Sequence, residues 1–171
     1  MKRSDKINDY LDNLPLAKGM KVLDIACGTG IISEELYRLT NTPVDAIDIS
    51  PKMIEIAKKN HPNPFVHFYN QDFYLIENKS YDCLIIFDAY PHFLDLDKFV
   101  LKANELLSQN GYLIILHDIG RKALEKSHKG VENISRSLLS PLDEAKRFLP
   151  FFKTIKSEED DEHYLIILQK M

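Results

Sequence analysis

Short apolar runs rich in β-branched residues alternate along this chain with stretches in which apolar residues recur at helical spacing. This alternation is typical of βαβ units, which build a parallel sheet flanked by helices. We predict strands over residues 21–26, 44–48, 65–69, 82–88, 111–117, 150–156 and 163–169. We predict helices over residues 4–13, 30–39, 51–60, 95–109, 121–136 and 141–148. The pattern therefore indicates an α/β fold with a seven-stranded sheet.

Several predicted elements begin or end with residues that cap helices. Ser50-Pro51 and Ser140-Pro141 each place a capping serine before a proline at the first helical position. Asn110-Gly111 is expected to end a helix ahead of the next strand. The last two strands are joined by the charged segment KSEEDDEH, which is too short for a crossover helix. We therefore expect a mostly parallel sheet with an antiparallel terminal hairpin.

Composition narrows the class of protein further. The chain has 171 residues, 44% hydrophobic and 28% charged, which fits one globular domain over residues 1–171. Its net charge of −4 gives no overall positive field for nucleic acid or an anionic membrane. Cys27 and Cys83 lie in apolar runs, as reduced, buried thiols do. No apolar run approaches the ~18 residues of a membrane-spanning helix, and the start MKRSDKINDY lacks the core of a signal peptide. We expect a soluble, cytoplasmic protein.

The segment VLDIACGTG, residues 22–30, joins a predicted strand to a glycine turn and places Asp24 beside it. In dinucleotide folds such a turn brings backbone N–H groups to a pyrophosphate. A carboxylate ~5 Å from a phosphate would repel it by roughly 3 kcal/mol at an effective dielectric of about 20. The third glycine of G-x-G-x-x-G is also replaced, because Ser33 follows Gly28 and Gly30. A ligand with a cationic amine and a sulfonium reverses the sign of the interaction with Asp24, and S-adenosylmethionine is such a ligand.

Two further acids follow the next two predicted strands. Asp48 ends the strand in VDAIDIS, where a carboxylate can accept from both hydroxyls of a ribose. Asp72 in FYNQDF follows the third strand, where it can accept from an adenine amino group with Phe73 beside the ring. Each of these residues alone also fits an ordinary solvated strand end or turn. Three acids after three consecutive strands form a narrower pattern.

Over roughly its full length the chain resembles class I S-adenosylmethionine-dependent methyltransferases, with LDIACGTG, DAIDISPKMIEIAKK, NQDF and YDCLIIFDAYPHF in the order of that family. Ala26 stands where the commoner signature has its first glycine. The resemblance implies a Rossmann-like three-layer αβα sandwich and S-adenosyl-L-methionine as cofactor. It implies that Asp24 lies at the methionine end, that Asp48 binds the ribose, and that Met53 and Asp72 contact the adenine. The cofactor-binding residues that it implies are Asp24, Ala26, Gly28, Gly30, Asp48, Ile49, Met53, Asp72, Phe73 and Asp88.

Catalytic candidates come from the segments after the fourth and fifth strands, because ligands on open α/β sheets bind at the carboxyl ends of strands. FDAYPHF supplies Asp88, Tyr90 and His92, and LHDIGR supplies His117 and Asp118. Methyl transfer is an in-line displacement that mainly needs alignment and exclusion of water. A hydroxyl or amide acceptor also needs a base, for which Asp88, His92 and His117 are the candidates. Packing roles for both histidines are the alternative, and Tyr90 is a candidate for contact with the substrate.

The segment RKALEKSH places Arg121, Glu125 and His128 on one face of a predicted helix. A solvated helix face is one interpretation. The others are that Arg121 and His128 contact an anionic substrate, or that His92, His117 and His128 converge on a metal ion. Dispersed histidines do not establish such a convergence, so we assign no metal ligand.

These expectations describe a methyltransferase that acts on an unidentified small-molecule acceptor. A non-catalytic or regulatory module that binds S-adenosylmethionine is the alternative. A nicotinamide-dependent oxidoreductase is disfavoured by Asp24 and by the missing third glycine. The apolar rim with Tyr90, Phe93, Leu138 and Leu139 fits either an acceptor or a second subunit, which leaves a homodimer open.

Overall fold

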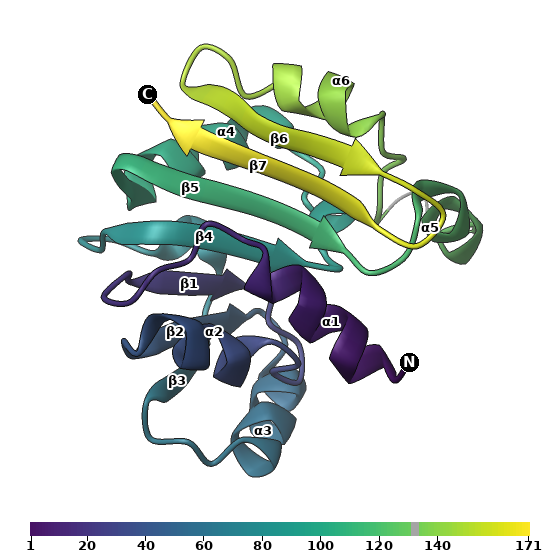
Figure 1. Cartoon of the computed structure of the whole chain (residues 1–171). Coiled ribbons are helices and arrows are strands. Elements are labelled where there is room, and N and C mark those ends of the chain that lie inside the picture. The colour runs from purple at the N-terminus through teal and green to yellow at the C-terminus, as the bar shows by residue number, and fades with distance from the viewer. Residues whose placement is uncertain (131–133) are drawn as a thin grey trace.

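The computed structural model describes residues 1–130 and 134–171 of the chain. The described residues form a seven-stranded sheet with the order β3-β2-β1-β4-β5-β7-β6 (Figure 1). The strands are β1 (Val22–Ile25), β2 (Val44–Asp48), β3 (Val66–Asn70), β4 (Tyr81–Phe87), β5 (Leu107–His117), β6 (Phe152–Glu159) and β7 (Tyr164–Lys170). The first five strands pair in parallel, whereas β7 runs antiparallel to both β5 and β6. The predicted mixed sheet with its terminal hairpin is confirmed.

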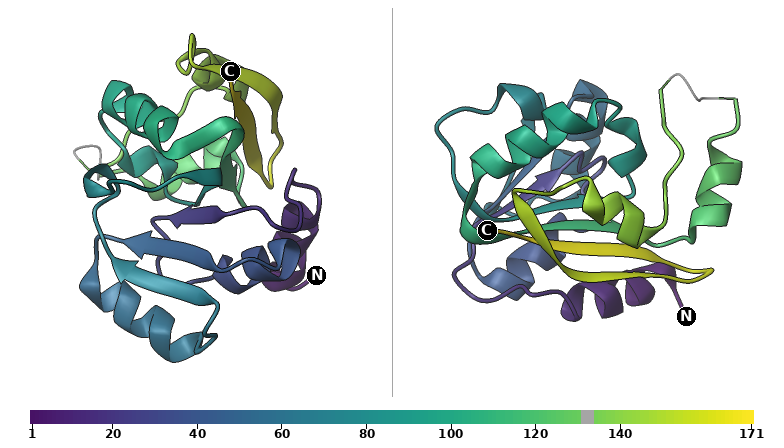
Figure 2. Two further views of the ribbon diagram at one scale, coloured as in Figure 1. Left: turned by 90° about the vertical axis from the view of Figure 1, so that its left-hand side faces the viewer. Right: turned by 90° about the horizontal axis from the view of Figure 1, so that it is seen from above.

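Helices cover both faces of this sheet (Figures 1 and 2). Their bounds are α1 (Arg3–Asp12), α2 (Ser33–Thr40), α3 (Pro51–Asn60), α4 (Leu96–Leu106), α5 (Arg121–Ser127) and α6 (Pro141–Lys146), with short 3-10 helices η1 (Phe73–Leu75) and η2 (Tyr90–His92). α1, α2 and α3 pack on one face, and α4 and α6 pack on the other. The three-layer sandwich that the family resemblance implies is therefore present.

Strand β4 shows why the central strands are apolar at successive positions. Cys83 and Ile85 point into the core beneath α1 and α2, while Leu84 and Ile86 point into the core beneath α4. All four side chains are fully buried. A parallel strand covered on both faces has no solvent side, so alternation of polar and apolar residues disappears.

The predicted serine caps are confirmed. The Ser50 hydroxyl accepts a hydrogen bond from the Met53 N–H at 3.3 Å, and the Ser140 hydroxyl accepts from the Asp143 N–H at 3.3 Å. Each cap satisfies a backbone donor that the first turn of a helix leaves unpaired. Proline follows the cap in both helices, so α3 and α6 begin where the sequence predicts.

Several predicted boundaries are wrong. The strand expected over 150–156 spans Phe152–Glu159, and the helix expected over 30–39 begins at Ser33. The helix expected over 121–136 ends at Ser127, and residues 134–140 are not helical, while residues 131–133 lie outside the described part. The helix expected over 95–109 ends at Leu106, and β5 begins at once. Asn110, with φ of 64°, therefore lies within an irregular start of β5, where pairing moves from Tyr81 opposite Leu107 to Cys83 opposite Tyr112. Asn110-Gly111 thus forms a bulge in a strand instead of a helix end.

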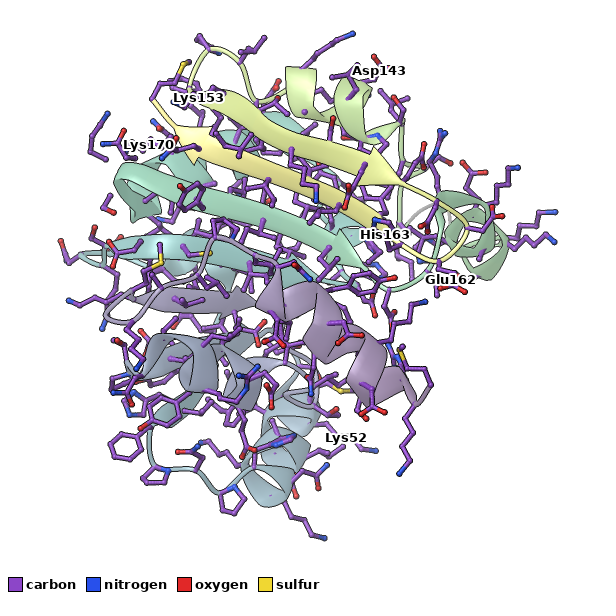
Figure 3. The ribbon with its side chains drawn as sticks, viewed as in Figure 1. Lys52, Asp143, Lys153, Glu162, His163 and Lys170 are labelled. Atoms are coloured by element: carbon purple, nitrogen blue, oxygen red, sulfur yellow. The ribbon has the colours of Figure 1, made fainter. Side chains whose placement is uncertain are left out.

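Charged residues lie at both ends of the terminal hairpin, β6–β7 (Figure 3). Figure 3 shows Lys153 and Lys170 at one end of the terminal hairpin and Glu162 in the turn at its other end. The Lys170 ammonium donates to the carbonyl oxygens of Asn104 and Leu107 at 2.7 and 2.8 Å, which holds β7 to the start of β5.

In the part of the chain that the structure describes, no helix is long and apolar enough to cross a membrane.

Candidate active site

A cavity of about 720 Å³ opens at the carboxyl ends of β1, β2 and β4. Ligands of open α/β sheets bind at this edge. The candidate residues that line the cavity are Asp24, Ala26, Gly28, Asp48, Ile49, Asp72, Phe73, Asp88 and His92. Apolar side chains, among them Ile31, Phe93 and Leu94, form much of the remaining wall. The structure therefore gathers acids from four different strand ends around one mostly apolar space.

The glycine turn after β1 forms the floor of this cavity. Ala26, Gly28 and Gly30 have φ values of 55°, 57° and 84°, the left-handed region that favours glycine. A Cβ built at Gly28 would meet no atom within 4 Å, so open space lies beside this residue. A Cβ at Gly30 would approach Phe68 Cζ to 2.9 Å. Gly30 therefore allows the turn to pack on β3, and it does not line the cavity.

Asp24, at the end of β1, is fully buried beside the glycine turn. Its Oδ2 accepts a hydrogen bond from the Ser33 hydroxyl at 2.7 Å. Its Oδ1 has no hydrogen-bond partner among the described residues. Burial raises the pKa of Asp24 to about 7; the Ser33 hydrogen bond opposes the shift, and the charge of Asp48 adds to it. A buried acceptor oxygen without a donor, on a cavity wall, suits a cationic or N–H-bearing ligand group.

Asp48 is held by the backbone on both of its carboxylate oxygens. Oδ2 accepts from the Gly28 N–H at 2.8 Å, and Oδ1 accepts from the Ser50 N–H at 2.9 Å. These bonds fix the carboxylate between the glycine turn and the start of α3, and each oxygen keeps a lone pair for a further donor. The next residue, Ile49, lines the cavity and is 73% exposed. Met53 lies one turn into α3, partly exposed and outside the cavity lining, so the structure does not bring it together with the other cofactor candidates.

Asp72 and Phe73 follow β3. The Asp72 side chain caps η1 by accepting from the Tyr74 N–H at 2.9 Å. Phe73 is buried, and its ring lies 5.3 Å from that of Phe99 and 5.9 Å from that of Phe93 between ring centres. Phe73 is therefore both a core residue and part of the cavity wall.

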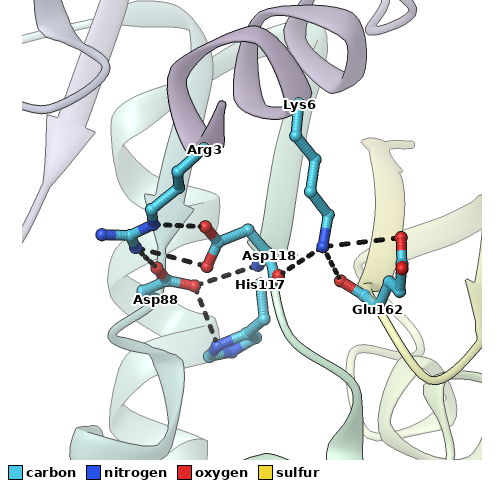
Figure 4. Close-up of polar contacts among 6 residues, drawn as sticks. All are labelled: Arg3, Lys6, Asp88, His117, Asp118 and Glu162. Atoms are coloured by element: carbon cyan, nitrogen blue, oxygen red, sulfur yellow. Dashed lines mark hydrogen bonds and ion pairs between the residues drawn. The ribbon is translucent and has the colours of Figure 1, made fainter. Parts of the chain in front are cut away.

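Asp88 stands at the centre of a charge network that closes the carboxyl ends of β4 and β5 (Figure 4). Arg3 of α1 donates to Asp118 Oδ2 at 2.6 Å and to Asp88 Oδ2 at 3.0 Å, and the Asp118 N–H donates to Asp88 Oδ1 at 3.1 Å. Lys6, one turn later, donates to the carbonyl oxygens of Asp118 and Glu162 at 3.0 Å each. This network anchors α1 across two strand ends.

The pKa values of Asp88 and Asp118, the two acids of the network, are shifted in opposite directions. Burial raises the pKa of Asp88 to about 7, and Asp118 adds to the shift. Burial alone would raise the pKa of Asp118 as well, but the hydrogen bonds with Arg3 and Asp88 and the charges of Arg3 and Lys6 together outweigh it and lower that pKa. Asp88 also has φ of 58°, a strained conformation for a residue other than glycine.

His92, His117 and His128, the three histidines that could converge on a metal ion, lie near one another but have different surroundings. His117 is fully buried, both its ring nitrogens lack a hydrogen-bond partner in the described chain, and burial lowers its pKa to about 4, with His128 contributing. His92 lines the cavity, and its Nδ1 lies 3.2 Å from the Ile134 carbonyl oxygen. The rings of His92 and His128 are 5.7 Å apart, and His128 Nδ1 lies 3.0 Å from the Ser135 hydroxyl. Within residues 1–130 and 134–171, no group of three or more His, Cys, Asp and Glu side chains has the geometry to hold a metal ion.

Tyr90 and Arg121 lie away from the cavity, contrary to the expectation that they contact the substrate. Tyr90 is fully buried and donates its hydroxyl to Glu144 Oε2 at 3.0 Å. Arg121 forms a two-pronged pair with Glu159 of β6 at 3.0 and 3.1 Å. A fully buried phenol and an arginine whose fork is filled offer no free group at the cavity, so both residues have structural roles here.

Sequence reasoning missed the partners of these groups. Ser33 stands where the dinucleotide fingerprint has its third glycine, and its hydroxyl is the donor to Asp24. Arg3 lies 115 residues from Asp118, and Glu144 lies 54 residues from Tyr90. No local pattern in the sequence marks such pairs, because they form only when the chain folds back on itself.

The profile of a family described as a methyltransferase domain matches residues 16–159. The chain belongs to the class I S-adenosylmethionine-dependent methyltransferases. The chain is 34% identical over 101 residues to a ubiquinone biosynthesis O-methyltransferase of Pelagibacter ubique, covering 57% of this chain and 42% of the relative. It is 31% identical over 139 residues to a malonyl-[acyl-carrier protein] O-methyltransferase of Acetivibrio thermocellus, covering 80% and 48%. The chain thus spans less than half the length of these two relatives.

A solved structure shares the fold of this chain. The magnesium protoporphyrin IX methyltransferase of Synechocystis, crystallised with bound SAH, aligns with a TM-score of 0.72 and 18% identity over 98% of this chain and 82% of that one. The cavity described above fits the cofactor of the family on its own features. The unpartnered Asp24 Oδ1, the open space at Gly28 and the fixed Asp48 carboxylate suit a cation, a close backbone approach and hydroxyl donors, respectively.

Proposed function

We propose that this protein transfers a methyl group from S-adenosylmethionine to a hydroxyl group of a small-molecule acceptor. The observation that carries the proposal is the unpartnered, buried Oδ1 of Asp24, a residue that lines the cavity together with Asp48. A diphosphate would meet two carboxylates at this place, whereas a cationic amine and a ribose find their partners.

Four residues would hold the cofactor in this proposal. Asp24 would accept from its amino group, Gly28 would let the backbone approach it, and Asp48 would accept from the ribose hydroxyls. Asp72 Oδ1 already accepts from Tyr74, so its remaining lone pairs would meet the adenine amino group. When bound, S-adenosylmethionine supplies an electrophilic methyl group on a sulfonium. Ile31, Phe93 and Leu94 on the wall would exclude water from it.

His92 is the side chain that we propose as the base toward the acceptor. It lines the cavity, as Asp88 does, but Asp88 is shared by Arg3 and the Asp118 N–H. His117 is neutral at pH 7 and does not line the cavity, so we propose that it supports Asp88, whose Oδ1 lies 3.6 Å from its Nδ1. Two relatives carry the names of O-methyltransferases, which supports an oxygen acceptor. A hydroxyl acceptor has to lose a proton, and this gives a base its role.

Calorimetric titration tests the cofactor part of the proposal. S-adenosylhomocysteine and S-adenosylmethionine are titrated into the protein, with NAD as the competing ligand. Asp48→Asn is expected to weaken S-adenosylhomocysteine binding by about tenfold or more. The amide has no negative charge and keeps only one of the two oxygens that would accept from the ribose hydroxyls. Asp82→Asn is the matched control, because Asp82 likewise accepts from a backbone N–H, that of Lys21, at the opposite end of β4. Binding of NAD in preference to both sulfur ligands would overturn the proposal.

Transfer is then measured with methyl-labelled S-adenosylmethionine and a panel of phenols, alcohols, carboxylates, amines and thiols. Label in a hydroxyl compound, lost in His92→Gln with cofactor affinity retained, supports the proposed acceptor class and base. Label in amines or thiols alone contradicts the hydroxyl acceptor.

A further inference from the structure

A buried ion pair behind the cavity wall takes no part in the proposed cofactor site. Glu144 of α6 is fully buried and accepts from four donors: Arg136 Nη1 at 2.8 Å, Arg136 Nη2 at 3.3 Å, the Leu139 N–H at 3.0 Å and the Tyr90 hydroxyl at 3.0 Å. A buried carboxylate with this many donors is fully satisfied. Such a cluster fixes the elements that it joins, here α6, the segment 134–139 and η2.

Arg136 joins this cluster to η2 by three further contacts. Its backbone N–H donates to the Pro91 carbonyl at 3.0 Å, and its Nε donates to the Phe93 carbonyl at 3.3 Å. The guanidinium also lies over the Tyr90 ring, 4.6 Å from the ring centre. The segment 134–139 is therefore held along the whole length of η2, although it is neither helix nor strand.

The consequence falls on His92, the last residue of η2. The Ile134 carbonyl oxygen, two residues before Arg136, lies 3.2 Å from His92 Nδ1. A carbonyl oxygen accepts hydrogen bonds and cannot donate one, so the neutral ring must carry its proton on Nδ1. Nε2 is then the nitrogen with the lone pair. The hydrogen bond that one ring nitrogen makes determines which nitrogen can accept a proton.

We propose that Arg136 and Glu144 are positioning residues for His92. By holding the Ile134 carbonyl against Nδ1, they keep Nε2 unprotonated as the proton-accepting nitrogen of a residue on the cavity wall. The inference rests on the proposed function for its meaning, because a base matters only where an acceptor loses a proton. Its physical content, the tautomer of His92, is measurable without an acceptor.

Nitrogen-15 NMR of the full chain with labelled histidine, recorded at pH 8, reads this tautomer directly. The His92 resonances are assigned by their loss in His92→Gln. We expect Nδ1 of the wild-type protein to show the shift of a protonated ring nitrogen and Nε2 that of an unprotonated one. In Arg136→Met the preference is expected to be lost, with both nitrogens moving toward averaged shifts.

Arg121→Met is the matched control. It removes an arginine that makes a similar two-pronged pair, with Glu159, at a distance from η2, and it should leave the His92 shifts unchanged. Because Arg136→Met leaves a buried charge unpaired and can unfold the chain, a double variant, Arg136→Met with Glu144→Leu, removes both charges together. A cooperative melting transition verifies that the double variant is folded.

Two results would overturn the inference. One is a wild-type His92 that carries its proton on Nε2. The other is a folded double variant in which His92 keeps the Nδ1–H tautomer as strongly as the wild-type protein.

Titration of the same samples with S-adenosylhomocysteine separates failure of the positioning role from failure of the proposed function. The positioning role predicts a lost tautomer with affinity within about twofold of wild type, because the pair does not line the cofactor cavity. A protein that binds no S-adenosylhomocysteine contradicts the proposed function and leaves the tautomer result standing.

Discussion

The two halves of the sheet's carboxyl edge differ in how their charges are satisfied. At the ends of β1 and β2, Asp24 and Asp48 take their donors from residues within 20 positions in the chain, and acceptor capacity remains at the cavity. At the ends of β4 and β5, Asp88 and Asp118 are bridged by Arg3, which is 85 and 115 residues away in the chain. The ends of β1 and β2 therefore keep acceptor oxygens for a ligand. The acids at the ends of β4 and β5 are paired with a cation of the protein itself, Arg3.

This difference explains why acids at equivalent strand ends behave differently. A carboxylate that keeps an unpartnered oxygen in a cavity binds an external donor at little rearrangement cost. A carboxylate already paired with arginine must first lose that pair. Four changes, taken from the largest expected effect to the smallest, test whether the two halves are as distinct as their contacts indicate.

Glu144→Leu is expected to have the largest effect on stability. It leaves Arg136, whose side chain is 16% exposed, without its carboxylate partner. Breaking a buried pair in this way costs roughly 3–5 kcal/mol of unfolding free energy. Urea denaturation measures the loss. The double change Arg136→Leu with Glu144→Leu should recover much of it, and a double variant no more stable than Glu144→Leu would show that the charge is not the cause.

Asp24→Asn should affect binding and stability in opposite directions. Because the folded-state pKa is raised from 3.8 to about 7, ionisation of Asp24 destabilises the free protein progressively as pH rises through that range. The variant should therefore gain roughly 1–3 kcal/mol of unfolding free energy at pH 8 and much less at pH 4. S-adenosylhomocysteine affinity should fall about tenfold, since an amide holds a cation less well than a carboxylate. If the difference in unfolding free energy between the variant and the wild type is the same at pH 8 and pH 4, the destabilisation by a buried Asp24 charge is contradicted.

Arg3→Gln addresses the acids at the ends of β4 and β5. Arg3 is 58% exposed, so solvent screens its pairs and the expected loss is about 0.5–1 kcal/mol at pH 7. Asp118 has a lowered folded pKa, so its contribution is present above its ordinary value of 3.8 and is lost as pH falls below it. The variant and the wild type should therefore converge in stability as the pH falls below 3.8. Arg38→Gln, which breaks pairs with Asp12 and Glu35 away from the cavity, is the control for a general loss of surface charge.

Ala26→Gly should have the smallest effect, and a stabilising one. Ala26 holds φ of 55°, where an alanine costs about 1 kcal/mol and a glycine costs much less. The gain in unfolding free energy is expected to be roughly 0.5–1 kcal/mol after the larger chain entropy of glycine. Ala57→Gly within α3 is the opposite control and should lose about 1 kcal/mol. A destabilised Ala26→Gly would mean that the methyl group packs usefully against its neighbours.

The glycine turn and the first three acids could be predicted because their geometry is local. Each acid directly follows its own strand, and parallel strands bring their carboxyl ends to one edge whatever the details of packing. The roles of Tyr90 and Arg121 could not be predicted in this way. Their partners, Glu144 and Glu159, come from α6 and β6, and the same residue types on a solvated surface give the same sequence pattern.

The predicted end of the helix over 121–136 is wrong for a related reason, because the helix stops at Ser127. Its residues have helical spacing, yet Arg136 lies beside η2, where burial of its pair with Glu144 replaces the hydrogen bonds of a helix. Tertiary contacts override helix propensity, which amounts to less than about 1 kcal/mol for most residues. The same contacts place Ile134 against His92 and so decide the tautomer of the proposed base.

The sequence by itself determined the order of strands and helices, the terminal hairpin, and the acids that gather at the cavity, because periodicity, caps and strand ends act over a few residues. Only the tertiary structure decided which of those acids stay open to a ligand. That choice depends on where the Ser33 hydroxyl and the Arg3 guanidinium come to lie. Arg3 is 85 residues from Asp88 and 115 from Asp118, and its position is set by the packing of the whole core.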